Sequence, residues 1–391
     1  MTDARTQVAI VGAGPAGLLL QQLLRLAGVE SVILEGRSRA YVEGRIRAGV
    51  LEPGSVALLD LAGVGERLKR EGLIHQGVEL ALDGERLRID IQALTGASVT
   101  VYGQSEITHD LFEAATAHTS PIVFEAEHVA LHDLDGDLAS VTWQKHGVEH
   151  RLHCDQVVGC DGRHGVSHTM IPAGAVQFHE RSYPFGWLGL LADVAPCAPE
   201  LIYANHAHGF ALASMRSPTR SRYYIQVEAQ DTVEHWPDER FWEEVALRLG
   251  PDAAAKLVRG PALEKSIAPL RSRVTEPMQW NRLFLAGDAA HLVPPTGAKG
   301  LNLAIADVGL LADALIAQHR SKDGAALAAY SRRALTRVWR AVRFSWWFTG
   351  LTHRFPDPDE FGRHLQRAEF DYLRHSKAAQ TVLAENYAGL F

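Results

Sequence analysis

Residues 7–17 of the chain read QVAIVGAGPAG, a short apolar run that leads into three glycines with the spacing GxGxxG. An amphipathic segment follows as far as about Gly28, and residues 31–35, SVILE, form a second apolar run that ends in an acid. The dinucleotide-binding fingerprint requires this order of elements: a strand, a glycine loop, a helix, a second strand and an acid. The stretch therefore predicts an α/β fold that begins with a dinucleotide-binding unit.

Each residue of the fingerprint has its own physical role. Gly12 permits a tight turn, Gly14 lets the backbone approach a pyrophosphate, and Gly17 lets the helix pack closely on the strand. Glu35 is expected to accept hydrogen bonds from a ribose 2′-OH and to repel a 2′-phosphate. These four residues predict that a dinucleotide binds here, but they do not say which one.

A second informative stretch, residues 282–302, reads RLFLAGDAAHLVPPTGAKGLN. It predicts an apolar strand, a break at Gly287 and Asp288, and a glycine-rich loop that opens a helix at about Asn302. Asp288 would lie at the carboxyl end of a strand, where open α/β sheets bind their ligands. Backbone N–H groups at the start of the following helix suit an anion. Such turns are common in α/β proteins, so the stretch gains its meaning from the fingerprint upstream.

The glycine clusters favour FAD over NAD. The chain has one complete GxGxxG, and a lone NAD site would leave Asp288 without an evident role. In an FAD site the fingerprint would hold the ADP half, while Asp288 would accept hydrogen bonds from the ribityl hydroxyls. The loop at 297–302 would donate N–H groups to the flavin. Asp161, in the strand-end cluster GCDGRH at 159–164, would lie near the pyrophosphate.

The bulk properties are those of a soluble globular enzyme. The chain has 391 residues, 47% of them apolar and 22% charged, and its net charge of −7 argues against nucleic acid as a partner. Its three cysteines include no CxxC pair, and its 19 histidines show no ligand spacing, so no metal site is expected. We expect neither a signal peptide nor a membrane-spanning run, and therefore a cytoplasmic location.

The pattern along the chain predicts a discontinuous nucleotide domain. An Asp83-Gly84 turn marks a hairpin, aromatic-rich strands follow from about Tyr183, and the sequence becomes helical after Gly300. We expect helices over 302–318, 323–350 and 359–385. The expected division is an FAD-binding domain from 1–75, 104–180 and 276–391, with substrate-domain strands at 76–103 and a substrate-binding sheet at 181–275.

The motifs GAGPAG, CDG and GDAAH, in this order, resemble those of the single-component flavoprotein aromatic hydroxylases. The resemblance extends over essentially the whole chain, through the stretches at 44–51, 183–191, 220–224, 344–347 and 385–387. It implies a mixed α/β fold in which a Rossmann-like FAD-binding domain carries an inserted β-sheet substrate domain and a helical C-terminal region. It also implies hydroxylation of 4-hydroxybenzoate to 3,4-dihydroxybenzoate by NAD(P)H and O2 through a flavin hydroperoxide, in a protein that is usually a homodimer.

The resemblance implies a grip on the substrate carboxylate. Arginine binds carboxylates with two parallel hydrogen bonds, and Arg216 lies two residues from Ser214, on the same face of a predicted strand. By resemblance, Arg216, Ser214 and Tyr224 hold the carboxylate. Arg222 corresponds to an arginine beside the flavin, where its charge would favour the reduced, anionic flavin.

The resemblance also implies a proton relay for the substrate hydroxyl. Tyr203 would contact the phenol, Tyr387 would follow it, and His75 would be the solvent-facing end of the relay. The carbonyl of Pro295 would contact the substrate hydroxyl, and Thr296 would lie beside the ring and the flavin.

Further residues are assigned by resemblance alone. Additional FAD-binding residues would be Arg45, Arg47, Gln104, Leu301 and Asn302. The nicotinamide coenzyme would dock on the surface through Arg37, Tyr41, His164 and Arg271. The chain has Gly36 where NADPH-preferring relatives carry a basic residue, but it keeps Tyr41 and Arg45, so we expect NADPH, with NADH also accepted. A solvated basic face is the alternative interpretation of this cluster.

Other functions remain open on the same scaffold. The carboxylate grip would also hold 4-aminobenzoate or a dihydroxybenzoate, whereas the WxW motif of flavin halogenases does not occur in the sequence. A non-catalytic flavin or aromatic-acid sensor would need no proton relay, and the presence of Tyr203, Tyr387 and His75 argues against it.

Overall fold

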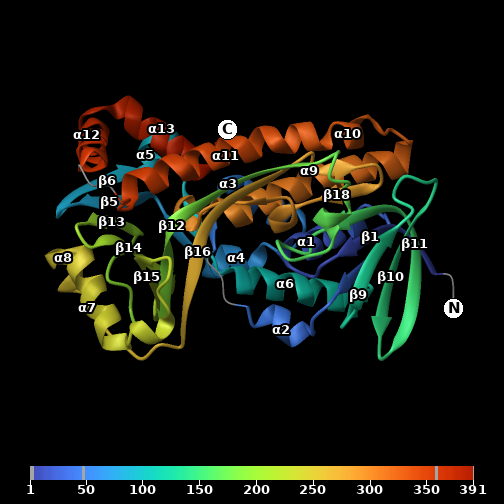
Figure 1. Cartoon of the computed structure of the whole chain (residues 1–391), viewed down its shortest axis with the longest axis horizontal. Coiled ribbons are helices and arrows are strands. Elements are labelled where there is room, and N and C mark those ends of the chain that lie inside the picture. Colours follow the sequence, from blue (N-terminus) through green and yellow to red (C-terminus); the bar gives the residue numbers. More distant parts are fainter. Residues whose placement is uncertain (1–3, 46–48, 357–359, 391) are drawn as a thin grey trace.

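The computed structural model describes residues 4–45, 49–356 and 360–390, and Figure 1 shows them as an elongated body. The described residues form two eight-stranded sheets and one three-stranded sheet. The two large sheets lie at opposite ends of the body, and the long strands β12 (Gln177–Ala192) and β16 (Glu264–Glu276) run between the two ends (Figure 1). The predicted mixed α/β fold is confirmed.

The first large sheet is the predicted nucleotide-binding one. Its centre is parallel, in the order β18-β11-β1-β2-β8, so that β11 lies between the first βαβ unit and β18, the strand that precedes GDAAH. Three further strands join it in antiparallel pairings. The strands are β1 (Ala4–Val11), β2 (Ser31–Glu35), β8 (Ile122–Phe124), β9 (Glu127–His132), β10 (Ala139–Lys145), β11 (Val148–Gly159), β17 (Gln279–Trp280) and β18 (Leu283–Leu285).

The second large sheet is mostly antiparallel and has the order β19-β16-β12-β15-β14-β13-β5-β6. The predicted Asp83-Gly84 hairpin supplies its last two strands. The remaining strands are β5 (Gly77–Leu82), β6 (Glu85–Asp90), β13 (Ile202–His206), β14 (Gly209–Ser217), β15 (Arg220–Glu228) and β19 (His291–Leu292). The small sheet joins β3 (Val50–Leu51), β7 (Val99–Val101) and β4 (Leu73–His75).

Helices cover both sheets. α1 (Pro15–Leu26) starts directly after the glycine loop and packs against α6 (Gln104–Ala117) and α9 (Lys299–Ser321), which places three helices against the parallel strands. Shorter helices lie between these elements and on the second sheet. They are α2 (Arg39–Glu43), α3 (Pro53–Leu61), α4 (Glu66–Glu71), α5 (Ile91–Thr95), α7 (Asp238–Leu249) and α8 (Pro251–Ala254).

The C-terminal helices differ from the expected boundaries. α9 begins at Lys299 rather than Asn302, and α10 (Ala325–Ala328) precedes α11 (Tyr330–Thr352), which spans the body in Figure 1. The expected helix over 359–385 is two helices, α12 (Phe361–His375) and α13 (Lys377–Ala388). The break occurs at Ser376, whose hydroxyl accepts the N–H of Ala379 at 3.2 Å and so caps α13.

Among the described residues, one helix, α9, is long and apolar enough to cross a membrane, a property that the sequence analysis does not expect. It meets this criterion because isolated acids such as Asp307 lower its average hydropathy little. More than half of its most apolar window is buried, against α1, α3 and α11. This burial is typical of a core helix.

Candidate active site

The glycine loop has the geometry that the fingerprint requires. Gly12 ends the β1 turn with φ +105°, and a Cβ there would lie 2.5 Å from the carbonyl oxygen of Cys160. A Cβ on Gly17 would collide with the carbonyl oxygen of Gly12. In contrast, a Cβ on Gly14 would meet no atom within 4 Å. The middle glycine thus borders open space at the N-terminus of α1, the place where a pyrophosphate would bind.

Glu35 ties the second strand to this loop. Its Oε2 accepts the backbone N–H of Ala13 and its Oε1 accepts that of Arg37, both at 2.8 Å. A carboxylate has about four acceptor positions, so two hydrogen bonds leave capacity for a ribose hydroxyl.

The GDAAH loop is fixed from behind by a buried ion pair. The N–H of Gly287 donates to Oδ2 of Asp307 at 3.0 Å, and Nε2 of His291 lies 2.6 Å from the same oxygen. Burial alone would lower the pKa of His291, but the Asp307 carboxylate outweighs burial and the pKa is raised. Asp288 itself is exposed. The His291–Asp307 pair was not predicted, although an isolated Asp in the apolar α9 was a signal for it.

Asp161 adds an acceptor at the same edge of the sheet. Its Oδ2 accepts the N–H and the hydroxyl of Ser167, both at 2.9 Å, while its Oδ1 is buried without a partner among the described residues. Burial raises the pKa of this carboxyl group. Because β1, β11 and β18 are parallel neighbours, Gly12, Asp161 and Gly287 all follow carboxyl ends at one edge of the sheet.

This edge fits FAD. The open space at Gly14 and the N-terminus of α1 suit a pyrophosphate. The exposed Asp288 and the unpaired oxygen of Asp161 are acceptors for hydroxyl groups. Leu301 lies in the first turn of α9, where backbone N–H groups lack intrahelical acceptors. Gln104 starts α6.

The side chain of Asn302 has a structural role. It is buried and fully used: Oδ1 accepts the N–H of Glu52 at 2.9 Å and the hydroxyl of Ser55 at 2.7 Å. Its Nδ2 donates to the carbonyls of Val50 and Ala298, both at 2.8 Å. The Asn302 side chain therefore fastens the loop to β3 and α3 and is not available to a cofactor.

The predicted carboxylate grip comes together. Nη1 of Arg216 donates to Oγ of Ser214 at 2.9 Å, and Nη2 lies 3.5 Å from the hydroxyl of Tyr224. Nε of Arg216 is buried and has no partner within the described part of the chain. Arg216 is half-buried, and among the described residues the nearby carboxylate of Glu264 forms its ion pair with Arg222. The guanidinium of Arg216 can therefore bind an acid.

Arg222 differs from its neighbour because its charge is already balanced. Its side chain is 6% exposed and forms two hydrogen bonds with the carboxylate of Glu264, at 2.7 and 3.2 Å. Its guanidinium also lies 5.3 Å from the ring centre of Tyr224. Glu264, on β16, was not predicted, and its negative charge offsets that of Arg222.

The two relay tyrosines are in contact. The hydroxyls of Tyr203, on β13, and Tyr387, on α13, are 3.0 Å apart, and both side chains are 2% exposed. Burial raises the pKa of Tyr203 well above its ordinary value and that of Tyr387 to about 12. Both phenols are therefore neutral at physiological pH, and the C-terminal helix folds back over the site as the relay requires.

His75 does not occupy the expected solvent-facing position, because its side chain is 1% exposed. Its Nε2 lies 2.9 Å from Sδ of Met215, and its Nδ1 has no partner in the described part of the chain. Burial lowers the pKa of His75, although the negative charge of Glu200 partly opposes this effect. No hydrogen bond between His75 and Tyr387 is present in this conformation of the described residues.

Pro295 and Thr296 form a tight turn before α9. The Pro295 carbonyl accepts the N–H of Ala298 at 2.9 Å and, with its second lone pair, can accept another bond. Thr296 is fully buried, and its hydroxyl accepts that of Thr349 on α11 at 2.9 Å.

A buried ion pair that the sequence did not reveal joins this turn to the C-terminus. Nζ of Lys299, which is 1% exposed, donates to Oε1 of Glu52 at 2.6 Å and to the carbonyl of Tyr387 at 2.9 Å. Arg337 reaches Oε2 of Glu52 at 2.7 Å. The pair fixes the backbone that carries one of the relay hydroxyls.

The coenzyme-docking residues are partly assembled. The guanidinium groups of Arg37 and Arg45 lie 5.4 and 5.9 Å from the ring centre of Tyr41, which is 50% exposed. His164 is exposed after β11, where it accepts Nε of Arg163 at 2.7 Å, and Arg271 is exposed on β16. No contact joins these last two residues to the first three in the described ranges, and Arg47 lies outside those ranges.

A separate groove of about 610 Å³ lies between α11 and α12 and includes none of the predicted site residues. Trp346, Trp347, Leu365 and Tyr372 form much of its wall.

Comparison with known proteins agrees with this geometry. The chain matches the profile of the family described as "FAD binding domain" over residues 5–345. It is 53% identical over 391 residues to p-hydroxybenzoate hydroxylase of Acinetobacter baylyi, a match that covers 100% of this chain and 96% of the relative. The crystal structure of p-nitrophenol 4-monooxygenase from Pseudomonas putida shares the fold, with a TM-score of 0.82, 19% identity and 99% coverage of both chains.

Proposed function

The chain belongs to the FAD binding domain family, and from this premise we propose that it is a flavoprotein monooxygenase that hydroxylates 4-hydroxybenzoate to 3,4-dihydroxybenzoate. Its substrates are an aromatic acid, O2 and NAD(P)H. The 53% identity to p-hydroxybenzoate hydroxylase over the full chain supports this assignment. The alternative substrates, 4-aminobenzoate and dihydroxybenzoates, share the carboxylate and are separated by experiment below.

One observation carries the proposal: the carboxylate grip and the phenol relay lie on the same face of one sheet. Tyr203, Leu212 and Tyr224 are directly paired across β13, β14 and β15, so their side chains point to one side. Ser214 follows Leu212 on that side at an alternate position. Arg216 lies at a register shift between Met215 and Ser217, and its guanidinium contacts Ser214 and Tyr224. The outer two strands are about 10 Å apart, a separation that suits one benzene ring with an acid at one end and a hydroxyl at the other.

Arg216 orients the substrate. Its unbalanced charge and its two hydroxyl neighbours, Ser214 and Tyr224, supply the planar donor set that a carboxylate needs. Binding an acid also gives this half-buried cation a negatively charged partner. The ring is thereby held with its hydroxyl toward Tyr203, and this fixed orientation selects the position that is oxidised.

Tyr203 and Tyr387 move the phenolic proton. Since both phenols stay neutral, the transfer occurs by a coordinated shift of hydrogen bonds rather than through a tyrosinate. His75, with an unpartnered Nδ1, is the proposed next member of the relay. Loss of the proton makes the ring electron-rich, which favours attack at the carbon beside the hydroxyl.

FAD, when bound, supplies the chemistry that accepts hydride from the nicotinamide and delivers one oxygen atom of O2. The residues that would hold it are those at the edge of the parallel sheet: Gly12, Gly14, Gly17, Glu35, Gln104, Asp161, Gly287, Asp288 and Leu301, with the backbone of Asn302. Arg45 and Arg47 are proposed as further contacts. Burial of Tyr203 and Thr296 keeps water away from the reacting atoms.

NADPH is the proposed reductant, with NADH also accepted. Its docking site comprises Arg37, Tyr41 and Arg45, together with His164 and Arg271. An exposed tyrosine between two guanidinium groups supports this assignment, because it offers an aromatic face and two positive charges to a phosphorylated nucleotide.

Two broader assignments accompany the reaction. We propose a homodimer, supported by the exposed apolar groups Trp346, Phe361, Leu365 and Tyr372 along α11 and α12. We propose a cytoplasmic location, supported by three cysteines that are all unpaired. Light scattering of the purified protein measures the first, and cell fractionation the second.

The test of the substrate assignment is a panel of acids. Oxidation of NADPH by the FAD-loaded protein is measured with 4-hydroxybenzoate, 4-aminobenzoate and dihydroxybenzoates, and the products are identified by mass spectrometry. We expect the highest kcat/KM and near-complete conversion with 4-hydroxybenzoate. A higher kcat/KM for another acid, together with formation of its hydroxylated product, would show that this other acid is the substrate. Arg216→Ala should weaken binding of every acid by about 10²-fold or more, since it removes a charge-assisted pair.

A further inference from the structure

α2 is a short helix that is held to the protein almost entirely by one side chain. None of its five residues is buried, and Val42 contacts the core only in part. In the described chain, the hydrogen bonds that join residues 38–45 to any other element all come from Arg39. Nδ1 of His109 on α6 lies 3.9 Å from Oε1 of Glu43, a longer contact, so the attachment of α2 depends mainly on Arg39.

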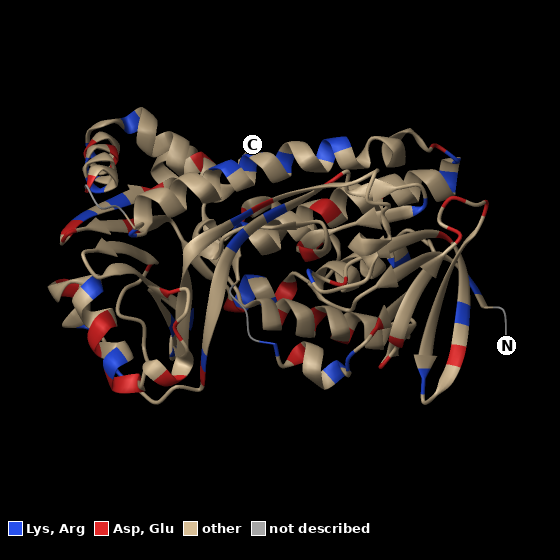
Figure 2. Cartoon of the chain, viewed as in Figure 1, with Lys and Arg blue, Asp and Glu red and all other residues tan. Residues whose placement is uncertain are grey.

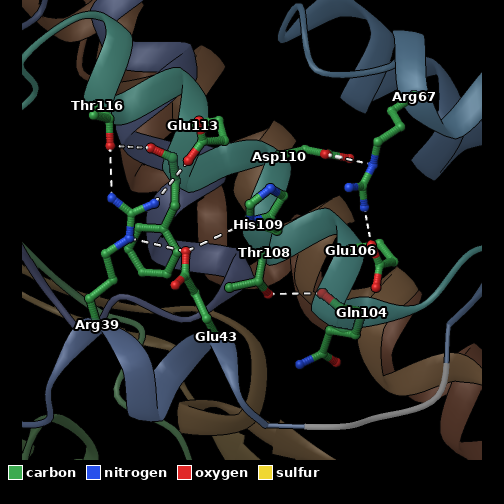
Figure 3. A network of polar contacts seen from close by, with 11 residues as sticks. Arg39, Glu43, Arg67, Gln104, Glu106, Thr108, His109, Asp110, Glu113 and Thr116 are labelled. Atoms are coloured by element: carbon green, nitrogen blue, oxygen red, sulfur yellow. Dashed lines mark hydrogen bonds and ion pairs between the residues drawn. The ribbon is translucent and has the colours of Figure 1, made fainter.

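Arg39 uses its whole guanidinium for this attachment, as Figure 3 shows. Nη2 donates to Oε1 of Glu113 and Nη1 donates to the hydroxyl of Thr116, both at 3.0 Å, and both acceptors lie on α6. Nε donates to Oε1 of Glu43 within α2, also at 3.0 Å. The group lies 5.0 Å from the ring centre of Phe112. Two carboxylates balance its single charge, although the side chain is 36% exposed.

The helix carries groups assigned to coenzyme docking. Tyr41 lies in the middle of α2, Arg37 precedes the helix and Arg45 follows it. The backbone of Arg37 is fixed independently, because its N–H donates to Glu35 and its carbonyl accepts the N–H of Glu125 at 3.3 Å. A shift of α2 would therefore move Tyr41 and Arg45 away from Arg37 and open their stacked arrangement.

We propose that Arg39 is a positioning residue for the nicotinamide coenzyme, which fastens α2 to α6 and so holds Tyr41 and Arg45 in the arrangement that docks the coenzyme. The inference rests on the proposed docking site. It assigns to Arg39 no contact with the coenzyme. It predicts that loss of the acceptor Glu113 weakens coenzyme docking as much as loss of the donor Arg39.

The test compares Arg39→Ala with Glu113→Gln in the FAD-loaded protein. Both changes should raise the KM for NADPH about three- to tenfold. Each removes an ion pair and its hydrogen bonds between α2 and α6, so that α2 spends less time in the position that docks the coenzyme. The value of kcat and the dissociation constant of 4-hydroxybenzoate should stay within about twofold. Glu113→Gln is the decisive variant, because it removes a negative charge and would by itself favour a polyanionic coenzyme. An unchanged or lower KM for NADPH in Glu113→Gln would overturn the proposal.

Figure 3 also supplies the matched control, Arg67→Ala. Arg67 pairs with Glu106 and Asp110 on the same helix α6, but it extends from α4 and does not touch α2. The KM for NADPH of the Arg67→Ala protein should be unchanged. An equal rise of this KM in Arg67→Ala and Arg39→Ala would contradict a specific role of Arg39. Tyr41→Ala tests the proposed docking site separately from the role of Arg39. If it leaves the KM unchanged, the docking site is wrong; if it alone raises the KM, the docking site stands and the role of Arg39 falls.

Discussion

Replacing Tyr203 with Phe removes one hydroxyl from the relay and leaves the aromatic ring in place. Since Tyr203 and Tyr387 are each other's partners at 3.0 Å, the change leaves the buried hydroxyl of Tyr387 without this bond. The expected cost is about 1–2 kcal/mol of folding free energy. At about 2.1 cal/mol/K of unfolding entropy per residue, this lowers the melting temperature by about 1–3 °C. The variant should therefore fold.

The effect on hydroxylation should be much larger than the effect on binding. Binding of 4-hydroxybenzoate loses one hydrogen bond, about 1 kcal/mol or about fivefold in the dissociation constant. Hydroxylation loses its proton acceptor, which costs about 10²- to 10⁴-fold in rate. The two are separated by titration of the ligand against the flavin absorbance and by measuring 3,4-dihydroxybenzoate per NADPH oxidised.

Tyr223→Phe is the control, because Tyr223 precedes Tyr224 on β15 and is fully buried on the other face of the sheet. It should leave both binding and product yield unchanged. A Tyr203→Phe protein with the full hydroxylation rate and product yield would refute the relay.

Three further predictions concern buried charges. His353 is fully buried, and burial lowers its pKa to about 3, so its contribution to stability is complete above pH 6.5 and is lost as the pH falls toward 3. The full loss is about 5 kcal/mol. In His353→Gln the urea concentration at the unfolding midpoint should therefore change less between pH 7 and pH 4 than in the unsubstituted protein; an equal change in the two proteins would contradict this. Glu52→Gln should cost about 3–5 kcal/mol in urea unfolding, because Lys299 remains buried without its carboxylate; a cost below about 1 kcal/mol would contradict it. The raised pKa of His291 means that its pairing stabilises the fold fully below pH 6.5 and is lost as the pH rises through the folded value. Asp307→Asn should remove this pH dependence from thermal melting curves, and its persistence would assign it to another group.

The fold was predictable because its signals are local. Gly12 has a positive φ, and a Cβ on Gly17 would collide with the backbone. Both positions require glycine, so the spacing of the glycines in the sequence indicates the structure of the loop. The hairpin at Asp83-Gly84 is equally local. The strand–loop–helix–strand order that ends at Glu35 likewise predicts the parallel pairing of β1 with β2.

The site was predictable only in part, because partner choice depends on tertiary contacts. Resemblance predicted that Ser214, Arg216 and Tyr224 act together, and the structure places Ser214 and Tyr224 within 3.5 Å of Arg216. It could not show that the Asn302 side chain is consumed by backbone groups of β3. Nor could it show that His75 is buried. Both outcomes result from chain segments that are distant in sequence.

Ion pairs between distant segments explain the remaining omissions. Glu264 balances Arg222 from a strand 42 residues away in sequence, and Glu52 reaches Lys299 over 247 residues. A charged residue in a sequence is ordinarily assigned to the surface, since charges are rarely buried. Without the fold, no pattern in the sequence pairs these residues.

The most direct test of the account is the yield of product per coenzyme. FAD-loaded protein is supplied with 4-hydroxybenzoate, O2 and limiting NADPH, and 3,4-dihydroxybenzoate and hydrogen peroxide are quantified at completion. The account predicts close to one 3,4-dihydroxybenzoate for each NADPH oxidised, with little peroxide. Oxidation of NADPH that yields hydrogen peroxide and leaves the 4-hydroxybenzoate unchanged would contradict it.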